Sequence, residues 1–268
     1  MPTPFQHLVY ADRIYQSLSL PPSLREALSA ARGAYLLGST AADVQAVTGQ
    51  ARVETHFYRL NDAGKHSAVA RLLASYPALA DPSMMSSDRA AFVSGYLVHL
   101  VWDEIWARDI FLPFYRDAEH WPDRLSYFVH HNALRVLLDR SAYRSLRDHA
   151  DLPVLLGGAV PDRWLPFATD GALLEWRDWL IEQLVDPSAI RTAEVFAMRM
   201  HVPVRDLEAI VAEMTGGRYE PGVDLAKALR HYESVALKAS LETLLRYWRI
   251  EDRLSLVCKV SAGHIARR

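Results

Sequence analysis

Apolar residues recur along the chain at intervals of three and four positions, which is the spacing of one face of an α-helix. The segments with this pattern run from Ser23 to Gly38, from Asp88 to about Phe111, from Ala189 to Met200 and from about Asp224 to Val260. Residues that favour a helix start precede three of them: Pro21-Pro22, Ser86 or Ser87, and Ser188. Strand-like alternation is almost absent, so the pattern predicts an all-α fold.

The last segment predicts a long C-terminal helix. Charged residues separate its apolar positions, which are Leu225, Leu229, Tyr232, Ala236, Ala239, Leu244 and Trp248. Gly216-Gly217 and Pro221-Gly222 end the helix before it, and the stretch from Gly49 to Gly64 is expected to form a loop.

The composition is that of a globular protein with one large core. Half of the 268 residues are hydrophobic and 23% are charged. We therefore expect a single all-α domain over residues 1–268. The turn-rich segment from Asp151 to Asp170 is the place for a seam if the chain has two domains.

Charge and cysteine content exclude several classes of protein. The net charge is −2 and no run of lysine or arginine is long enough to follow a nucleic-acid backbone, so an extended nucleic-acid groove is not expected. The single cysteine, Cys258, cannot form an internal disulfide, and the first residues lack the basic and apolar regions of a signal peptide. No apolar run is as long as a membrane span, so the sequence predicts a cytoplasmic protein without a transmembrane segment. It leaves the oligomeric state open.

One apolar stretch, GYLVHLVWDEIW from Gly95 to Trp106, carries a histidine and a carboxylate four residues apart. On a helix, His99 and Asp103 share one face. Asp103 has no lysine or arginine four positions away, whereas Glu104 has Arg108 at that spacing. A buried carboxylate without a partner is costly, so the fold must supply a cation or hydrogen-bond donors. A metal ion is one such cation, and a simple hydrogen bond between His99 and Asp103 is the alternative.

Three residues upstream are further candidate metal ligands, and each has an ordinary explanation as well. Asp43 follows Thr40 at the spacing of a helix capping box, His56 falls in the expected loop, and His7 lies near the start of the chain. A capping role for Asp43 and a solvated position for both histidines are the alternatives to metal binding.

The order of these residues resembles the zinc-dependent phospholipase C and S1/P1 nuclease family. The resemblance consists of His7, the motif GSTAAD from Gly38 to Asp43, the motif Thr-His-Phe from Thr55 to Phe57, and His-x-x-x-Asp from His99 to Asp103. It implies an all-α phospholipase C/P1 nuclease-like core built around a cluster of up to three zinc ions.

The resemblance also implies a set of ligands. Asp43, His56, His99 and Asp103 would hold one zinc ion, and Asp103 would bridge to another ion bound by His7 and the N-terminal amine. If Met1 is removed, that amine belongs to Pro2; a frayed N-terminal end is the alternative.

Two imidazoles and two carboxylates satisfy a tetrahedral divalent ion, and they suit manganese or iron as well as zinc. Ions of this kind bind a phosphodiester and lower the pKa of a water molecule. Asp43, which can also accept the proton of that water, is the candidate catalytic base.

The sequence departs from the family at the second zinc site. There the family has a histidine in the segment after the match of His99, and then a His-x-x-x-Glu/Asp pair. Asp109 stands at the first position, and His130 and His131 are followed four residues on by Leu134 and Arg135. The second site is therefore altered or missing.

These observations predict a zinc-dependent phosphoester hydrolase that acts on a small phosphodiester such as a phospholipid or a nucleotide. A noncatalytic helical metalloprotein, whose metal stabilises the fold or an interaction surface, is the alternative. A phosphohydrolase of the HD kind ranks third, because the adjacent pair Asp148-His149 has the reverse order.

Two groups of residues are interpreted as packing rather than as sites. They are the aromatic residues Trp102, Trp106, Phe111, Phe114 and Tyr115, and the methionines Met198 and Met200 beside His201.

Overall fold

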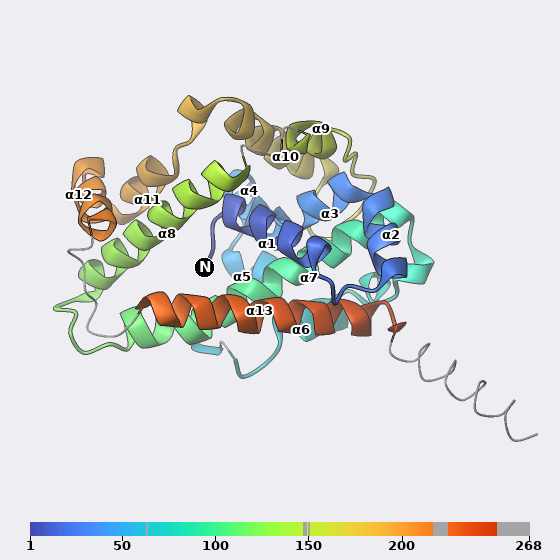
Figure 1. Cartoon of the computed structure of the whole chain (residues 1–268), viewed down its shortest axis with the longest axis horizontal. Helices are drawn as coiled ribbons and strands as arrows, with labels where there is room; N and C mark the ends of the chain where they lie inside the picture. The colour runs from blue at the N-terminus through green and yellow to red at the C-terminus, as the bar shows by residue number, and fades with distance from the viewer. Residues whose placement is uncertain (63, 147–148, 150, 217–224, 251–268) are drawn as a thin grey trace, which may run out of the picture.

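The computed structural model describes residues 1–62, 64–146, 149, 151–216 and 225–250. This part of the chain is helical and contains no strand, which confirms the all-α fold (Figure 1). The α-helices are α1 (Pro4–Gln16), α2 (Pro22–Ala30), α3 (Arg32–Gly38), α4 (Gln45–Thr48), α5 (Arg52–His56), α6 (Ala68–Ser75), α7 (Ser87–Trp106), α8 (Arg124–Leu146), α9 (Leu152–Gly157), α10 (Asp170–Val185), α11 (Thr192–Met200), α12 (Val204–Thr215) and α13 (Leu225–Tyr247). Short 3₁₀ turns lie at Ala41–Val44, Leu60–Asp62, Pro77–Leu79, Pro82–Met84 and Pro187–Ala189.

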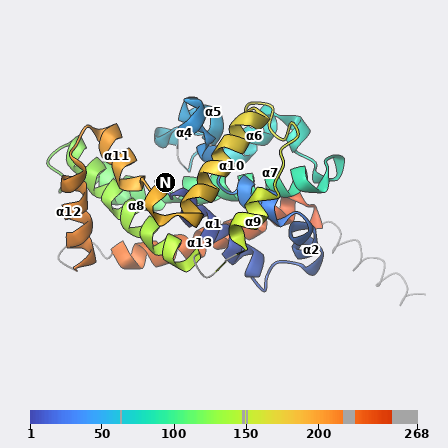
Figure 2. The same ribbon diagram turned by 90° about the horizontal axis from the view of Figure 1, so that it is seen from above.

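The central element of the fold is α7. From Ala90 to Trp106 every residue except Glu104 is buried. Figure 1 shows α13 along one edge of the molecule and α9 and α10 along the opposite edge, with α1, α3 and α7 between them. Seen from above, α4 and α5 lie on one side of the molecule, and α8, α11 and α12 form one end of it (Figure 2). A helix that is apolar on all sides must be enclosed by other elements, and α7 is enclosed in this way.

Two glycines allow α3 and α7 to cross backbone against backbone. A Cβ atom on Gly95 would lie 2.1 Å from the carbonyl oxygen of Tyr35, and one on Gly38 would lie 2.0 Å from that of Phe92. No side chain can occupy either position without moving the helices apart. This crossing places the end of α3 directly against the middle of α7, where His99 lies.

Helix boundaries agree with the sequence pattern in some places and differ in others. Ser86 caps α7 as predicted, because its hydroxyl accepts a hydrogen bond from the Arg89 amide at 3.3 Å. The expected helix from Ser23 to Gly38 is instead two helices that break at Ala31, where φ is −128° and ψ is 44°. The break turns α3 so that Gly33 packs against the carbonyl of Leu155 on α9.

The predicted cap at Ser188 is wrong. Ser188 lies in a 3₁₀ turn, where its amide and its hydroxyl both donate to the Asp186 carboxylate at 2.8 and 2.7 Å. The helix α11 begins later, at Thr192. The aspartate therefore uses the serine in a local turn, which is a common alternative to helix capping.

The helix that begins with α7 does not end near Phe111. It continues as a wider π-helical segment, Ala107–Arg116, which contains Pro113. Proline has no amide hydrogen for the regular helical ladder, and a widened turn accommodates that loss.

The long C-terminal helix is present as α13, with Tyr232, Ala236 and Leu244 buried against the core. The expected end of this helix at Val260, together with Cys258, Asp148, Gly217 and Pro221-Gly222, lies outside the described residues. None of the described helices is long and apolar enough to cross a membrane.

Buried apolar residues form two clusters. The larger one joins helices α1, α2, α3, α7 and α13, and it includes Leu152 and Leu156 of α9 from the segment suggested as a seam. The smaller one joins α8, α11 and α12 through residues such as Val136, Phe196 and Leu207. The single-domain organisation stays a prediction.

The aromatic residues interpreted as packing are core residues. Trp102, Trp106, Phe111 and Tyr115 are buried, and Phe114 packs against the same cluster. The interpretation of Met198 is wrong, because its side chain is exposed, whereas Met200 is partly buried against the smaller cluster.

Replacing Gly95 with alanine should separate α3 from α7. We expect the free energy of unfolding to fall by about 1–3 kcal/mol, the usual cost of overpacking. Thermal unfolding measures the change, with Gly171→Ala as the control because the nearest atom to its added Cβ is 3.9 Å away. Equal melting temperatures for the two variants would contradict the close crossing.

Candidate metal centre

The fold brings all five predicted ligands together from four separate elements. His7 comes from α1, Asp43 from the 3₁₀ turn Ala41–Val44, His56 from the end of α5, and His99 and Asp103 from α7. Two sets of three have ligand atoms that all lie within 4.8 Å of one another. They are His7, His99 and Asp103, and Asp43, His56 and His99.

The carboxylate of Asp103 lies at the middle of this cluster. Its Oδ2 is 3.3 Å from Nε2 of His56 and 3.8 Å from Nε2 of His99, and its Oδ1 is 3.3 Å from Nε2 of His7. A separation of 3.8 Å is too long for a hydrogen bond. The alternative that His99 and Asp103 simply bind one another is therefore wrong.

Backbone carbonyls orient two of the histidines. Nδ1 of His99 is 2.9 Å from the carbonyl oxygen of Ser39, and Nδ1 of His56 is 3.2 Å from that of Arg52. A carbonyl only accepts, so in the neutral ring of His99 Nδ1 carries the proton and Nε2 keeps a lone pair. Nδ1 of His56 also lies 2.9 Å from the hydroxyl of Thr55. Both Nε2 atoms face the carboxylates, and that of His56 lies 3.5 Å from Oδ1 of Asp43.

Several buried polar atoms of the cluster have no hydrogen-bond partner among the described residues. They are both ring nitrogens of His7 and Oδ1 of Asp103; Nε2 of His7 and this Oδ1 lie 3.3 Å apart without forming a well-aligned hydrogen bond. The ring of His7 stacks on that of His99 with centroids 3.7 Å apart. Unsatisfied buried polar atoms are rare because each is costly, and a divalent ion would take these nitrogen and oxygen atoms as ligands. The residues present therefore fit a metal ion.

The buried carboxylate of Asp103 needs a nearby cation, and Arg52 provides one. Its guanidinium contacts Oδ2 of Asp103 and lies 3.0 Å from the hydroxyl of Tyr58. Sequence reasoning missed Arg52 because the stretch from Gly49 to Gly64 was expected to be a loop. It contains α5, and on that helix Arg52 and His56 are four residues apart on one face.

Electrostatics keep the two carboxylates ionised. Burial raises the pKa of Asp103, but the neighbouring His56 and His7 outweigh burial and hold the pKa well below its usual range. Burial acts on Asp43 in the same way, and His56 and His99 lower the pKa of that carboxyl overall. Burial, followed by the effect of His7, lowers the pKa of His99 to about 3, so its imidazole is neutral. The centre therefore combines two ionised carboxylates with a neutral His99 and the guanidinium of Arg52.

The ordinary explanations for Asp43 and His56 are wrong. The hydroxyl of Thr40 donates to the Leu37 carbonyl at 3.0 Å and accepts from Trp176 Nε1 at 3.1 Å, so it does not cap a helix. His56 is completely buried rather than solvated. The side chain of Asp43 is 23% exposed, whereas that of Asp103 is 1% exposed, so Asp43 marks the open side of the cluster.

The residues at the second zinc position do not join the cluster. Asp109 binds Arg108 at 2.5 Å, which also replaces the expected pair between Glu104 and Arg108. The carboxylate of Glu104 accepts a hydrogen bond from the Ala68 amide instead. His131 is buried and its Nε2 accepts from Trp106 Nε1 at 3.0 Å.

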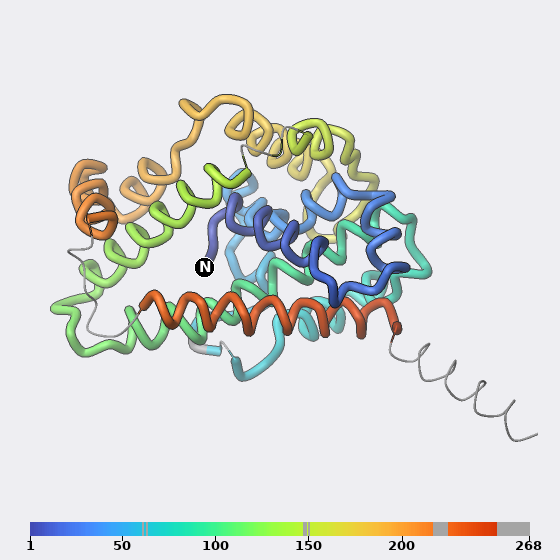
Figure 3. The backbone as a smooth tube through the Cα atoms, viewed as in Figure 1, coloured from blue at the N-terminus to red at the C-terminus, as the bar shows by residue number. Residues whose placement is uncertain are grey.

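The first residues of the chain lie at the middle of the molecule (Figure 3). Pro2 and Thr3 are buried, and the Thr3 amide donates to Oε1 of Gln6 at 3.1 Å, so this end is not frayed. Burial, followed by the charge of Arg135, lowers the pKa of the Met1 amine well below its ordinary value. Ligation by a terminal amine stays a prediction.

Comparison with known proteins gives one match. Residues 6–106 match the family model described as zinc dependent phospholipase C. Neither a curated protein nor a solved structure matches the chain. The match confirms the resemblance over the span that holds all five candidate ligands, and it ends before Asp109 and His131.

Replacing His99 or Asp103 with alanine should abolish metal retention and lower the melting temperature. Each residue belongs to the set that includes His7, and each is buried. Elemental analysis of the purified variants measures metal per chain, with Asp109→Asn as the control outside the cluster. Full occupancy in both alanine variants would show that the ligands are elsewhere.

Replacing Arg52 with glutamine should destabilise the metal-free protein by about 3 kcal/mol, because the buried Asp103 carboxylate loses the guanidinium that contacts it. Added zinc should reverse most of this loss, because a bound ion offsets the same charge. Unfolding in chelator and in zinc measures both values. Arg71→Gln, which removes a half-exposed pair with Asp62, is the control. If zinc did not restore the stability lost in Arg52→Gln, the idea that Arg52 and the ion offset the same charge on Asp103 would be contradicted.

Proposed function

We propose that this chain, with its match to zinc dependent phospholipase C over residues 6–106, is a zinc-dependent phosphoester hydrolase. The observation that carries the proposal is the buried cluster in which two sets of three side chains each place their ligand atoms within 4.8 Å of one another: His7, His99 and Asp103, and Asp43, His56 and His99. Within this cluster His99 is neutral and both carboxylates are ionised, which is the state in which such side chains bind a divalent ion. Two carboxylates and three histidines rarely gather in a core that serves only for packing, because each buried polar group is costly.

The ion would be held by Asp43, His56, His99 and Asp103, and His7 with Asp103 offers ligands for another ion. Nitrogen and oxygen ligands also suit manganese or iron, and the family match favours zinc. A divalent ion bound there would supply a Lewis acid for a phosphate oxygen and a water molecule of lowered pKa.

Asp43 is the proposed catalytic base. Its carboxylate is ionised and partly exposed, so a water molecule can reach it, and Oδ1 faces His56. The other oxygen, Oδ2, would accept the proton of the attacking water. Asp103 is enclosed by three histidines and Arg52, which suits a ligand rather than a base.

The substrate class that follows from this chemistry is a small phosphodiester, such as a phospholipid or a nucleotide. Such a substrate carries a single negative phosphate, which an ion and a nearby guanidinium would both stabilise. The shared fold does not choose between the two kinds of substrate.

One observation favours a second candidate function. The positions of the second zinc are occupied by an ion-paired Asp109 and by a His131 that accepts from Trp106. A chain that retained only the ligands Asp43, His56, His99 and Asp103 would suit a noncatalytic metalloprotein. Its ion would hold α5 and the turn Ala41–Val44 against α7.

Hydrolysis of bis-p-nitrophenyl phosphate by the zinc-loaded chain distinguishes the two functions. We expect turnover that chelator abolishes, and a loss of about 10²–10⁴-fold in Asp43→Asn, which keeps part of its metal but lacks a base. Asp109→Asn, the matched control, should retain the rate. If no turnover above buffer appears with zinc, manganese or iron from mildly acidic to mildly basic pH, the noncatalytic function is favoured.

A further inference from the structure

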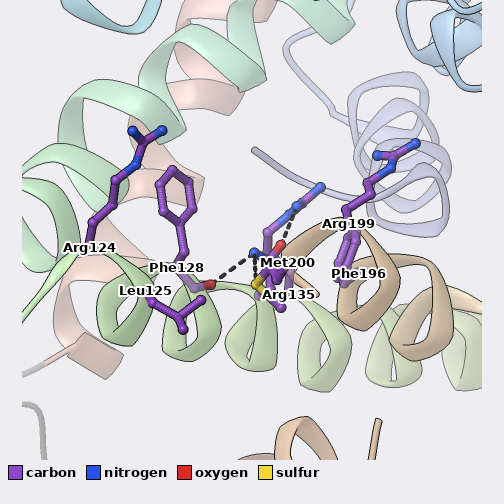
Figure 4. Close-up of a pocket in the computed structure, with 8 residues that line it drawn as sticks. Arg124, Leu125, Phe128, Arg135, Phe196, Arg199 and Met200 are labelled. Carbon is purple, nitrogen blue, oxygen red and sulfur yellow. Dashed lines mark hydrogen bonds between the residues drawn. The ribbon is translucent and has the colours of Figure 1, made fainter. Parts of the chain in front are cut away.

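A cavity of about 510 Å³ lies between α8 and α11, and none of the five candidate ligands lines it. Its lining combines arginines with apolar side chains: Arg124, Leu125, Phe128, Asn132, Arg135, Phe196, Arg199 and Met200. In Figure 4, Arg124 and Arg199 stand on opposite sides of the cavity, with Phe128 between them. The volume is sufficient for a small organic molecule.

The charge of this cavity is entirely positive. It is lined by three arginines and, within the described part of the chain, by no aspartate or glutamate. Arg124 and Arg199 are exposed, and neither has a carboxylate within ion-pair distance among the described residues. In Figure 4 the guanidiniums of Arg135 and Arg199 lie on the same side of the cavity, and Arg124 lies across from them. Guanidinium groups without a neighbouring carboxylate are suited to a phosphate, which they bind through paired hydrogen bonds.

Arg135 is held in place at the inner wall. Its Nε donates to the carbonyl oxygen of Met1 at 2.6 Å, and one amino group donates to Oδ1 of Asn132 at 2.7 Å. Its guanidinium lies over the ring of Phe196, 4.2 Å from the centroid. The other amino group makes no hydrogen bond to any described residue. A donor that is fixed before binding loses little entropy when a ligand arrives.

The apolar part of the lining can accept more than a phosphate. The side chain of Leu125 is 51% exposed, and Phe128 and Met200 are partly buried beside it. Arg124 lies over the ring of Phe128 at 5.1 Å, so a charged group and an apolar surface adjoin. An exposed apolar side chain inside a cationic cavity favours a ligand that is both anionic and apolar.

Arg135 also links the cavity to the metal centre. Burial lowers its pKa to about 10, and the carboxylates of Asp43 and Asp103 act in the opposite direction, which places them within electrostatic reach. Arg135 is the fourth residue after His131 on α8. A guanidinium cannot bind a metal ion, but it supplies a fixed positive charge at that position.

We propose that this cavity binds a net-anionic phosphate ester, with the phosphate on Arg135 and Arg199 and an apolar arm against Leu125, Phe128 and Met200. That this ester is also the substrate of the metal centre rests on the proposed function. Binding of the ester in the cavity requires no metal ion. The cavity offers no carboxylate to a quaternary ammonium, so a zwitterionic ester should bind less well than an anionic one.

Titration calorimetry of the full chain in chelator tests this selectivity with four probes. They are hexyl phosphate, hexylphosphocholine, inorganic phosphate and hexanol. We expect hexyl phosphate to bind about tenfold more tightly than inorganic phosphate, because part of its chain is buried. It should also bind about tenfold more tightly than hexylphosphocholine, and hexanol should not bind.

Single substitutions assign the two halves of the ligand. Arg199→Gln should weaken both hexyl phosphate and inorganic phosphate by about tenfold, whereas Leu125→Ser should weaken hexyl phosphate alone. Both side chains are exposed, so both variants should fold, which thermal unfolding checks. The matched control is Arg205→Gln, which alters an exposed arginine on α12 outside the cavity.

Equal binding of hexyl phosphate and hexylphosphocholine, or equal effects of Arg199→Gln and Arg205→Gln, would overturn the proposal. Its failure is separable from that of the proposed function. Binding of hexyl phosphate in chelator, together with no hydrolysis of bis-p-nitrophenyl phosphate by the zinc-loaded chain, would support the cavity and contradict the hydrolase. Hydrolysis of bis-p-nitrophenyl phosphate without binding of hexyl phosphate would support the hydrolase and contradict the cavity.

Discussion

The structure depends on the burial of one carboxylate. Asp103 lies in the apolar core at 1% exposure, and an ionised group there must be surrounded by donors or cations. The elements around α7 supply them: α1 brings His7, α5 brings Arg52 and His56, and α7 itself brings His99. Segments far apart in the sequence thus converge on one charge, and a change in any of them alters the environment of Asp103.

Close backbone packing fixes the geometry of this centre before any ion binds. Gly38 and Gly95 let α3 reach α7, and the crossing brings the Ser39 carbonyl within 2.9 Å of Nδ1 of His99. On the other side, the hydroxyl of Tyr96 donates to the Thr55 carbonyl and ties α5 to α7. His99 and His56 each lie against a backbone carbonyl, whose position depends on helix packing rather than on a flexible side chain.

The sequence predicted the helical fold and the ligand cluster because both depend on short-range patterns. His99 and Asp103 share a face through helical spacing alone, and the motifs around Asp43 and His56 carry the family resemblance. It did not predict Arg52, because α5 is only five residues long and its sequence resembles a loop. The break at Ala31 and the turn at Ser188 were missed for a related reason. Contacts with α9 and with Asp186 decide them, and periodicity does not encode such contacts.

Arg52 and Arg135 suggest how such a centre could act on a phosphate with fewer ions. One guanidinium contacts Asp103, and the other lines the cavity between α8 and α11. A metal ion provides positive charge and also activates water, whereas a guanidinium provides only the charge. On our proposals, phosphate binding by Arg135 and water activation near Asp43 are therefore carried by different groups. Because a guanidinium is not removed by a chelator, binding and chemistry become separable in this chain, which they are not where one ion performs both.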